Sequence, residues 1–296
     1  MLAEGLACRV CGAGVVFGGV VTGHIARRTF RLASCPECGF AFIADPLADF
    51  AGIYTEDYYS GRGADPLVNY VAEALAPERT IRRYEWRGVL KAVAELTPIT
   101  GDTKWLDLGC GLGGLVTYLR DRGIDAVGAD EGWGASWCKD HGVPLVDAAT
   151  TTERFDVITS IEVIEHVPDP LGFLRQVARL LRPGGLFWLT TGNAVPWRGR
   201  LDVWPYVIPE IHVSFFEPRT MAQAMARAGL EHHDAVWTRG HPDIIRFKVL
   251  KNLRRNRTGT VERLIPWSFA SCLVERRYGA LQHPYARSPR ADAPAG

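Results

Sequence analysis

Short apolar runs alternate with helix-like segments across the middle of the chain. Each run is bounded by glycine, proline or charged residues, and the runs are KWLDLG, AVGAD, VPLVD, FDVITS and GLFWLTT. Runs of this kind, without a polar residue at every second position, are typical of parallel strands buried on both faces. The pattern therefore predicts an α/β fold with a doubly wound, mainly parallel sheet.

Other segments show helical or irregular patterns. Apolar positions recur at spacings of three and four over residues 68–96, which predicts one or two helices. Residues 218–230 have proline at a likely first turn and glycine at a likely C-cap, so they predict a further helix, with EHHDAVW as the strand that leaves it. The segment 244–263 is basic, and we expect the last dozen residues, rich in proline, alanine and arginine, to be disordered.

Four of the seven cysteines occur as two matched pairs near the N-terminus. The pattern is C-x2-C-x23-C-x2-C, formed by Cys8, Cys11, Cys35 and Cys38, and each pair is followed by glycine. Four thiolates suit a tetrahedral structural Zn²⁺, and glycine permits the tight turn around the metal. A redox dithiol would not account for the repeated CxxCG form. The sequence predicts a small N-terminal zinc ribbon of short strands.

Composition sets the class and the expected domain organisation. The 296 residues are 47% hydrophobic, enough for a large core, and the net charge of +1 makes nucleic acid an unlikely main partner. No run approaches the roughly 18 apolar residues of a membrane span, and the start lacks the features of a signal peptide, so we expect a cytoplasmic protein. We expect a zinc ribbon (1–45), an aromatic connector and helical cap (46–100), a core (101–240) and a basic C-terminal extension with a disordered tail (241–296).

A glycine loop follows the first of the central strands, in KWLDLGCGLGG. Its glycines allow a sharp turn and close approach of a ligand to the backbone, and the spacing also matches the dinucleotide fingerprint, with Asp130 placed to bind a ribose. Asp107 argues against a dinucleotide, because an acid beside the loop would repel its pyrophosphate. The same acid suits a ligand that carries an ammonium and a sulfonium. S-adenosylmethionine (SAM) carries both. The loop glycines are Gly109, Gly111, Gly113 and Gly114.

These motifs together resemble the class I SAM-dependent methyltransferases. The resemblance covers roughly residues 100–240 and rests on D-x-G-x-G-x-G, the acid of AVGAD, Asp147 after the third strand and RLLRPGG before the fifth. It implies a seven-stranded Rossmann-like sheet, with Asp107 and the glycine loop at the methionine end of SAM. It further implies that Asp130 holds the ribose and Asp147 the adenine amine. The alternative for Asp130 is a helix N-cap.

The stretch IEVIEHVPDP follows the fourth strand, at the sheet edge where ligands bind in such folds. If it continues as a helical turn, Glu162, Glu165 and His166 project to one side, which we expect to face the methyl donor. A solvated helix start is the alternative. PEIHVSFFEP supplies His212 before the next helix.

Two resemblances give this cluster different roles. E-x-x-E-H followed by H-x-x-F is similar to ubiquinone-pathway O-methyltransferases and small-RNA 2′-O-methyltransferases, which implies a divalent cation such as Mg²⁺ held beside the acceptor hydroxyl. The ribbon, the tyrosine-rich connector and EHVPDP together resemble zinc-ribbon methyltransferases of sugar and natural-product pathways. That resemblance implies that His166 is a general base and that Tyr54, Tyr58 and Tyr59 close over the cofactor. The tyrosines are equally compatible with a packed cluster.

The leading hypothesis is methyl transfer from SAM to oxygen or carbon of a small metabolite, a sugar or natural-product intermediate, with a histidine base. The alternatives are a metal-assisted O-methyltransferase and an RNA methyltransferase. In the last, the ribbon would bind RNA through His24, Arg27, Arg28 and Arg31, with the basic 244–263 stretch adding phosphate contacts. The acceptor and the oligomeric state stay open.

Overall fold

The computed structural model describes residues 2–49, 51–64, 66–233, 238–278, 281–282 and 284–289. The chain divides into two compact units. Unit 1 comprises residues 1–53, 148–235 and 280–296, and unit 2 comprises residues 54–147 and 236–279. Within the described residues, no helix is both long and apolar enough to cross a membrane.

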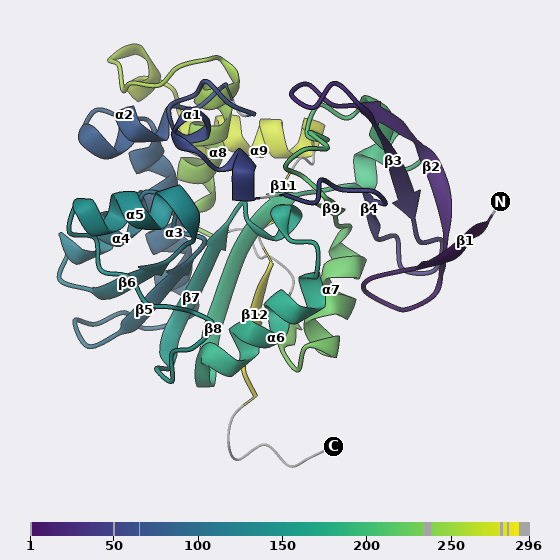
Figure 1. The fold of residues 1–296 in the computed structure, drawn as a ribbon. Coiled ribbons are helices and arrows are strands. Elements are labelled where there is room, and N and C mark those ends of the chain that lie inside the picture. Colours follow the sequence, from purple (N-terminus) through teal and green to yellow (C-terminus); the bar gives the residue numbers. More distant parts are fainter. Residues whose placement is uncertain are drawn as a thin grey trace. The chain divides into compact units, whose positions relative to one another are not determined.

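The N-terminal part of unit 1 is an antiparallel sheet with strand order β1-β2-β3-β4-β9 (Figure 1). The β2–β3 pairing runs from Val16 opposite Ser34 to Thr22 opposite Thr29, with one irregularity near Gly19. In β3, side chains alternate between the two faces of the sheet, and Phe30 and Leu32 lie on the face that is buried. The strands are β1 (Leu2–Ala7), β2 (Gly14–Thr22), β3 (Thr29–Ser34), β4 (Ala41–Ile43) and β9 (Ser214–Phe215).

The rest of unit 1 is a mixed sheet with strand order β10-β12-β8-β7. The long strands β7 and β8 pair in parallel, and β12 pairs antiparallel with both β8 and β10. Helices α6 and α7 each begin with proline, which suits a first helical turn. The elements are β7 (Phe155–Ile161), α6 (Pro170–Leu180), β8 (Leu181–Gly192), α7 (Pro218–Arg227), β10 (Glu231–His233), β11 (Leu281–Gln282) and β12 (Tyr285–Arg287), with one-turn 3-10 helices η1 (Ala51–Ile53), η2 (Ile164–His166), η3 (Val195–Trp197) and η4 (Leu201–Val203).

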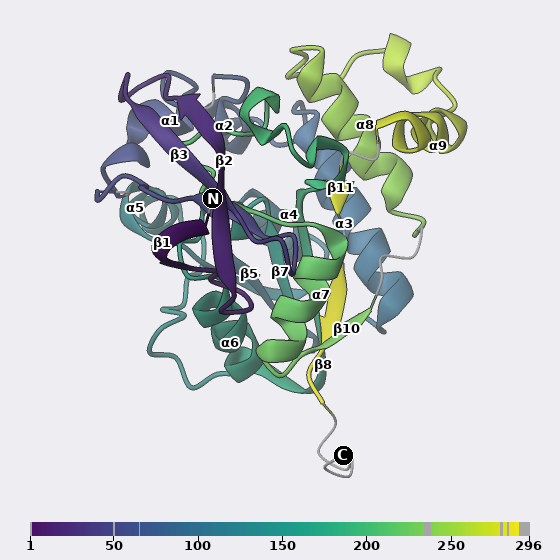
Figure 2. The same cartoon turned by 90° about the vertical axis from the view of Figure 1, so that its right-hand side faces the viewer.

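Unit 2 contains the parallel pair β5–β6 and a set of helices (Figure 2). Helix α8 packs along α3, and α9 packs on α8. The elements are α1 (Glu56–Tyr59), α2 (Tyr70–Leu75), α3 (Arg82–Leu96), β5 (Lys104–Leu108), α4 (Gly114–Arg120), β6 (Asp125–Ala129), α5 (Gly132–Asp140), α8 (His241–Asn252), η5 (Val261–Arg263) and α9 (Trp267–Tyr278).

Part of the basic 244–263 segment is engaged inside unit 2. Lys248 pairs with buried Glu85 at 3.4 Å, and Arg246 donates to the hydroxyl of Tyr84 at 2.9 Å. Both basic side chains are largely buried, at 14% and 9% exposure. These two contacts therefore join α8 to α3, and loss of one partner of a buried ion pair such as Lys248–Glu85 costs about 3–5 kcal/mol.

The expected α/β class is confirmed, with three local corrections. VPLVD is not a strand, since only Leu145 forms an isolated bridge, to Gly128. EHHDAVW is a strand only over β10, and residues 234–237 lie outside the described part. The disorder expected for the last dozen residues is wrong for β12, because Ala286 is fully buried between its neighbours Phe187 and His232; residues 290–296 are not described.

Candidate functional site

The glycine loop in unit 2 joins β5 to α4 with backbone angles that favour glycine. Gly109 has φ +82° and Gly113 has φ +74°, in the left-handed region. A Cβ on Gly113 would also lie 2.5 Å from Val143, so both the backbone angle and the lack of space disfavour a side chain at this position. Asp107, at the end of β5, is only 4% exposed. An acid is thus held at low exposure beside a loop whose backbone a ligand can approach closely.

Asp130 follows β6 and binds the same loop. Its carboxylate accepts hydrogen bonds from the amides of Gly111 at 2.7 Å and Glu131 at 2.8 Å. Burial raises the pKa of Asp130 to about 6, although both amide bonds act in the opposite direction. The N-cap of α5 is Glu131, so the helix-cap alternative for Asp130 is wrong. Asp147 lies exposed in an irregular segment of the same unit.

Two of the connector tyrosines, Tyr58 and Tyr59, are buried, and Tyr59 lies close to Asp130. The hydroxyl of Tyr59 would be 2.7 Å from a Cβ on Gly134, and burial followed by the charge of Asp130 raises the pKa of Tyr59. Its ring stacks on Trp133 with centroids 5.3 Å apart, and Tyr58 meets it edge-on at 5.2 Å. The tyrosines form a packed aromatic cluster beside Asp130. Closure of these rings over a bound cofactor stays a prediction.

The IEVIEHVPDP stretch lies in unit 1, and its second residue has a strained backbone. Glu162 has φ +54°, a left-handed conformation that costs a non-glycine residue roughly 1–2 kcal/mol. The backbone then forms only one short 3-10 turn, η2. The expected helical turn through Glu162 is therefore wrong: the chain bends at this residue, and Glu165 and His166 follow on the 3-10 turn.

The Glu165 carboxylate is fully buried and held by two hydroxyls. Tyr206 donates to Oε1 at 2.5 Å, and Thr191 donates to Oε2 at 3.0 Å. Burial, followed by the charge of Glu162, raises the pKa of Glu165 to about 8, while both hydroxyl bonds lower it. Such a carboxyl holds a proton readily unless a positive charge lies next to it.

Two histidines accompany this carboxylate in fixed orientations. Nδ1 of His166 lies 3.0 Å from the carbonyl oxygen of Ile211, and Nδ1 of His212 bonds the carbonyl of Tyr206. Because a carbonyl only accepts, each Nδ1 carries the proton and each Nε2 keeps its lone pair. The two rings meet edge to face with centroids 4.7 Å apart. Burial and the neighbouring His212 lower the pKa of His166 to about 3.

Glu165, His166 and His212 form a group that fits a cation. One ligand atom from each lies within 4.8 Å of the others; among the described residues this group does not include Glu162. Histidine Nδ1–H donated to a backbone carbonyl is the arrangement usual for metal-binding imidazoles. Two imidazoles and one carboxylate suit Mn²⁺ or Fe²⁺ better than Mg²⁺, which prefers oxygen ligands.

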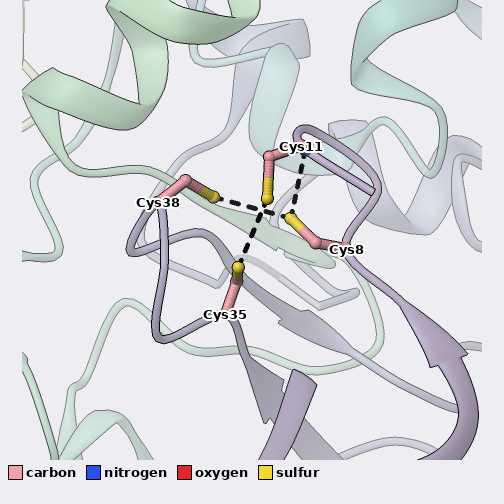
Figure 3. Close-up of side chains that lie close together, drawn as sticks. All are labelled: Cys8, Cys11, Cys35 and Cys38. Carbon is pink, nitrogen blue, oxygen red and sulfur yellow. Dashed lines mark hydrogen bonds between the residues drawn. The ribbon is translucent and has the colours of Figure 1, made fainter. Parts of the chain in front are cut away.

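The four N-terminal cysteines converge in unit 1 (Figure 3). Sγ of Cys8 lies 3.5 Å from Sγ of Cys38, and Sγ of Cys11 lies 3.4 Å from Sγ of Cys35. A tetrahedron of sulfurs about 2.3 Å from a zinc ion has edges of about 3.8 Å. Backbone amides also point at sulfur, from Val10 to Cys8 and from Phe40 to Cys38, each at 3.4 Å. This thiol set fits Zn²⁺.

Three polar residues of the site have no signal in the local sequence pattern. Thr191 and Tyr206 reach Glu165 from segments distant in the chain. Glu210 is fully buried and accepts from the amides of Ile25 at 2.8 Å and Ala26 at 3.3 Å, so it fixes the β2–β3 loop to the segment that carries His212.

A glycine loop with acids at the ends of two parallel strands defines an enzyme that binds an adenosine cofactor. A family model described as a methyltransferase domain matches residues 78–235, just over half of the chain. The chain belongs to this methyltransferase family and is a class I SAM-dependent methyltransferase.

Individual relatives agree with this family. The ubiquinone biosynthesis O-methyltransferase of Saccharophagus degradans is 31% identical over 192 residues, covering 54% of this chain and 81% of the relative. That of Aeromonas salmonicida is 28% identical over 207 residues, covering 59% and 87%. A solved phosphoethanolamine N-methyltransferase 2 from Haemonchus contortus has a TM-score of 0.48 at 14% identity, over 82% of this chain and 61% of that chain, too distant to support a finer assignment.

Proposed function

We propose that the protein transfers the methyl group of SAM to an oxygen of a small acceptor, with Glu165, His166 and His212 binding a divalent cation. The observation that carries this proposal is the convergence of one ligand atom from each of the three residues within 4.8 Å. When bound, such a cation lowers the pKa of a hydroxyl and orients it. The printed names of the ubiquinone biosynthesis relatives support oxygen as the acceptor atom.

The residues around the cluster prepare its ligands. Tyr206 and Thr191 each hold one oxygen of Glu165, which fixes the plane of the carboxylate. The carbonyls of Ile211 and Tyr206 select the histidine tautomer with a lone pair on Nε2. A cation would also compensate the buried charge of Glu165, whose pKa burial otherwise raises to about 8.

A second candidate is direct proton removal by His166. Its Nε2 lone pair supports this role, since Nδ1 is engaged by Ile211. The pKa of about 3 opposes it, because a general base works best with a pKa near the operating pH. We therefore favour the cation. In either case the expectation that the cluster faces the methyl donor stays a prediction, as do a sugar or natural-product acceptor and an RNA acceptor.

The cofactor would be bound in unit 2 by Asp107, Asp130 and the glycine loop. Asp130 already orders Gly111, and its remaining lone pairs suit ribose hydroxyls. Asp147 is the most exposed of the proposed ligands. In unit 1, Cys8, Cys11, Cys35 and Cys38 would hold a structural Zn²⁺, because all four positions of the tetrahedron are supplied by protein.

Calorimetric titration of the zinc-loaded protein with Mn²⁺ tests the proposal without knowledge of the acceptor. We expect one saturable site, lost in His212→Gln and retained in His24→Gln, which changes an exposed histidine of the same unit. Equal Mn²⁺ binding in both variants would contradict the proposed cluster. No Mn²⁺ binding by the unaltered protein, with or without S-adenosylhomocysteine, would favour His166 as a metal-independent base.

A further inference from the structure

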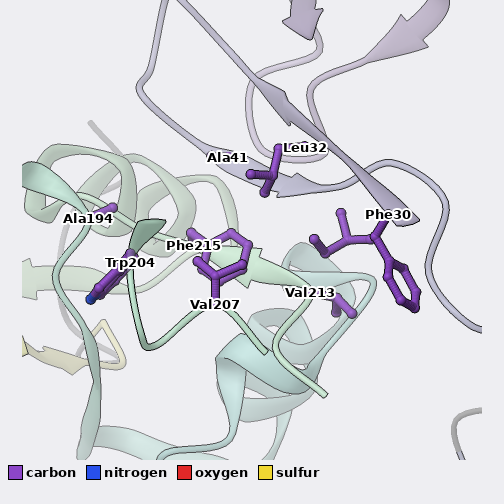
Figure 4. Packing of buried hydrophobic residues seen from close by; sticks show 9 residues of the cluster. Phe30, Leu32, Ala41, Ala194, Trp204, Val207, Val213 and Phe215 are labelled. Carbon is purple, nitrogen blue, oxygen red and sulfur yellow. The ribbon is translucent and has the colours of Figure 1, made fainter. Parts of the chain in front are cut away.

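A cavity of about 290 Å³ lies in unit 1 against one face of the antiparallel sheet β1-β2-β3-β4-β9, which we call the ribbon. Its apolar wall includes Leu32 and Ala41 from the ribbon and Ala194 and Leu201 from the chain after β8. Three of these residues are buried members of the hydrophobic cluster in Figure 4, and Leu201 packs against that cluster. The wall is therefore a fixed apolar surface, and the volume of the cavity suits a small organic molecule.

The rim of the cavity is strongly basic. Among the described residues, three arginines line it, Arg198, Arg200 and Arg219, and the one acid lining it is Glu217. The Glu217 carboxylate accepts from Arg198 at 2.7 and 2.6 Å and from Arg219 at 2.8 Å. One carboxylate accompanies three guanidinium groups, so the rim keeps a formal excess of two positive charges.

These guanidiniums retain hydrogen-bonding capacity. Arg198 and Arg219 have side chains that are 61% and 55% exposed, and each uses only part of its donors on Glu217. Arg200 lies over the ring of Trp197 at 5.2 Å, and no hydrogen bond from its side chain occurs among the described residues. Arginine forks of this kind match the oxygens of phosphate and carboxylate groups.

The second cysteine pair holds the acidic side of the rim in place. Gly39 has φ +79°, which favours glycine, and a Cβ there would lie 2.5 Å from the carboxylate of Glu217 and 2.8 Å from the guanidinium of Arg219. Thr220 donates to the carbonyl of Cys38 at 2.6 Å, which fixes the start of α7 beside the same turn. The charged groups are thus arranged before any ligand binds, which reduces the entropy cost of binding.

We propose that this cavity is a binding site for an organic anion that consists of a phosphate or carboxylate group on a compact apolar body. The arginines would hold the anionic group and the ribbon face would cover the apolar body. The lining residues do not include Glu165, His166 or His212, so the proposed anion site shares no residue with the proposed methyl-transfer cluster and its test does not depend on that function.

The test is a fluorescence titration of the full-length, zinc-loaded protein at constant ionic strength. Trp197 reports on the rim because it lies under Arg200 and stacks near Trp204, with centroids 6.0 Å apart. The probes are phenyl phosphate, benzoate and phenol. We expect saturable binding of at least one anion and at least tenfold weaker binding of phenol; the tighter anion identifies the preferred head group.

Variants separate a built site from general charge. Arg200→Gln should weaken anion binding at least fivefold, and Arg200→Lys should recover part of it. Arg175→Gln, which removes an exposed arginine of α6 in the same unit, should have no effect. Both Arg200 and Arg175 are exposed, so circular dichroism should show folded variants. The proposal is overturned if neither anion binds, if phenol binds as tightly, or if the two glutamine variants behave alike.

Discussion

The phenol of Tyr206 donates a hydrogen bond of 2.5 Å to Oε1 of Glu165, across 41 residues of sequence. The same hydroxyl accepts from the amide of Gly192 at 3.0 Å, and a Cβ on Gly192 would touch the Tyr206 ring at 2.5 Å. The carboxylate is therefore oriented by a residue that is itself fixed by the end of β8. This relationship makes Tyr206 a positioning residue for the cluster.

Tyr206→Phe should weaken Mn²⁺ binding by about tenfold, because a hydrogen bond to a charged group contributes about 1.5 kcal/mol or more. Loss of the phenol also removes a bond that lowers the pKa of Glu165, so the carboxyl should hold its proton more tightly. Calorimetry at two pH values measures both effects. Tyr118→Phe is the control, and an equal loss of affinity in the control would contradict the role of Tyr206.

The pKa of Glu165 predicts a pH-dependent stability. Its pKa is raised from the ordinary 4.5 to about 8, so the folded state binds a proton that the unfolded state releases in this range. The contribution of this group to stability is therefore present below pH 4.5 and lost as the pH rises through about 8. Without added divalent cation, the melting temperature should fall more from about pH 5 to about pH 9 in the unaltered protein than in Glu165→Gln.

Saturating Mn²⁺ should reverse that trend, because a cation favours the ionised carboxylate. The zinc content must be the same in every sample. If melting curves of the two proteins run parallel over the whole range, with and without Mn²⁺, Glu165 does not titrate as its surroundings predict.

Asp130→Ala should weaken SAM binding by about tenfold or more, since it removes a charged hydrogen-bond acceptor and releases the amide of Gly111. Asp147→Ala should have a smaller effect, because Asp147 is exposed in an irregular segment. Calorimetry with SAM and with NAD compares the variants. Unchanged SAM affinity in Asp130→Ala, or preferential binding of NAD, would contradict the cofactor assignment.

Cys35→Ser should remove the zinc and lower the melting temperature by more than about 5 °C, because a filled tetrahedral site stabilises the fold. Elemental analysis and a thermal melt measure the two quantities. Cys272→Ser is the matched control, since Cys272 is exposed and lies outside the cysteine group. Full zinc content in Cys35→Ser would require another site for the metal.

The sequence predicted features that depend on local pattern. Strands β5, β6 and β7 follow apolar runs with clear boundaries, and the start of α7 follows from Pro218. The cysteine group was predictable because its spacing repeats. The sequence predictions failed where strand formation depends on pairing with residues distant in the chain. The segment β12 becomes a strand because β8 and β10 pair with it, whereas VPLVD forms no strand because it bridges β6 at Leu145 alone.

The candidate site shows the same division. The sequence motifs supplied Glu165, His166 and His212 as candidates, but not the strained φ of Glu162, where the chain bends although a helical turn was expected. Tyr206 could not be inferred, because its contact with Glu165 spans 41 residues and carries no periodic signal.

The most direct test of the central claim is anomalous scattering from a crystal of the protein with Mn²⁺ and S-adenosylhomocysteine. We expect an Mn²⁺ peak about 2.0–2.3 Å from a carboxylate oxygen of Glu165 and from Nε2 of both His166 and His212, separate from zinc at the four cysteines. A crystal that shows zinc at the cysteines and no Mn²⁺ among these three residues would contradict it.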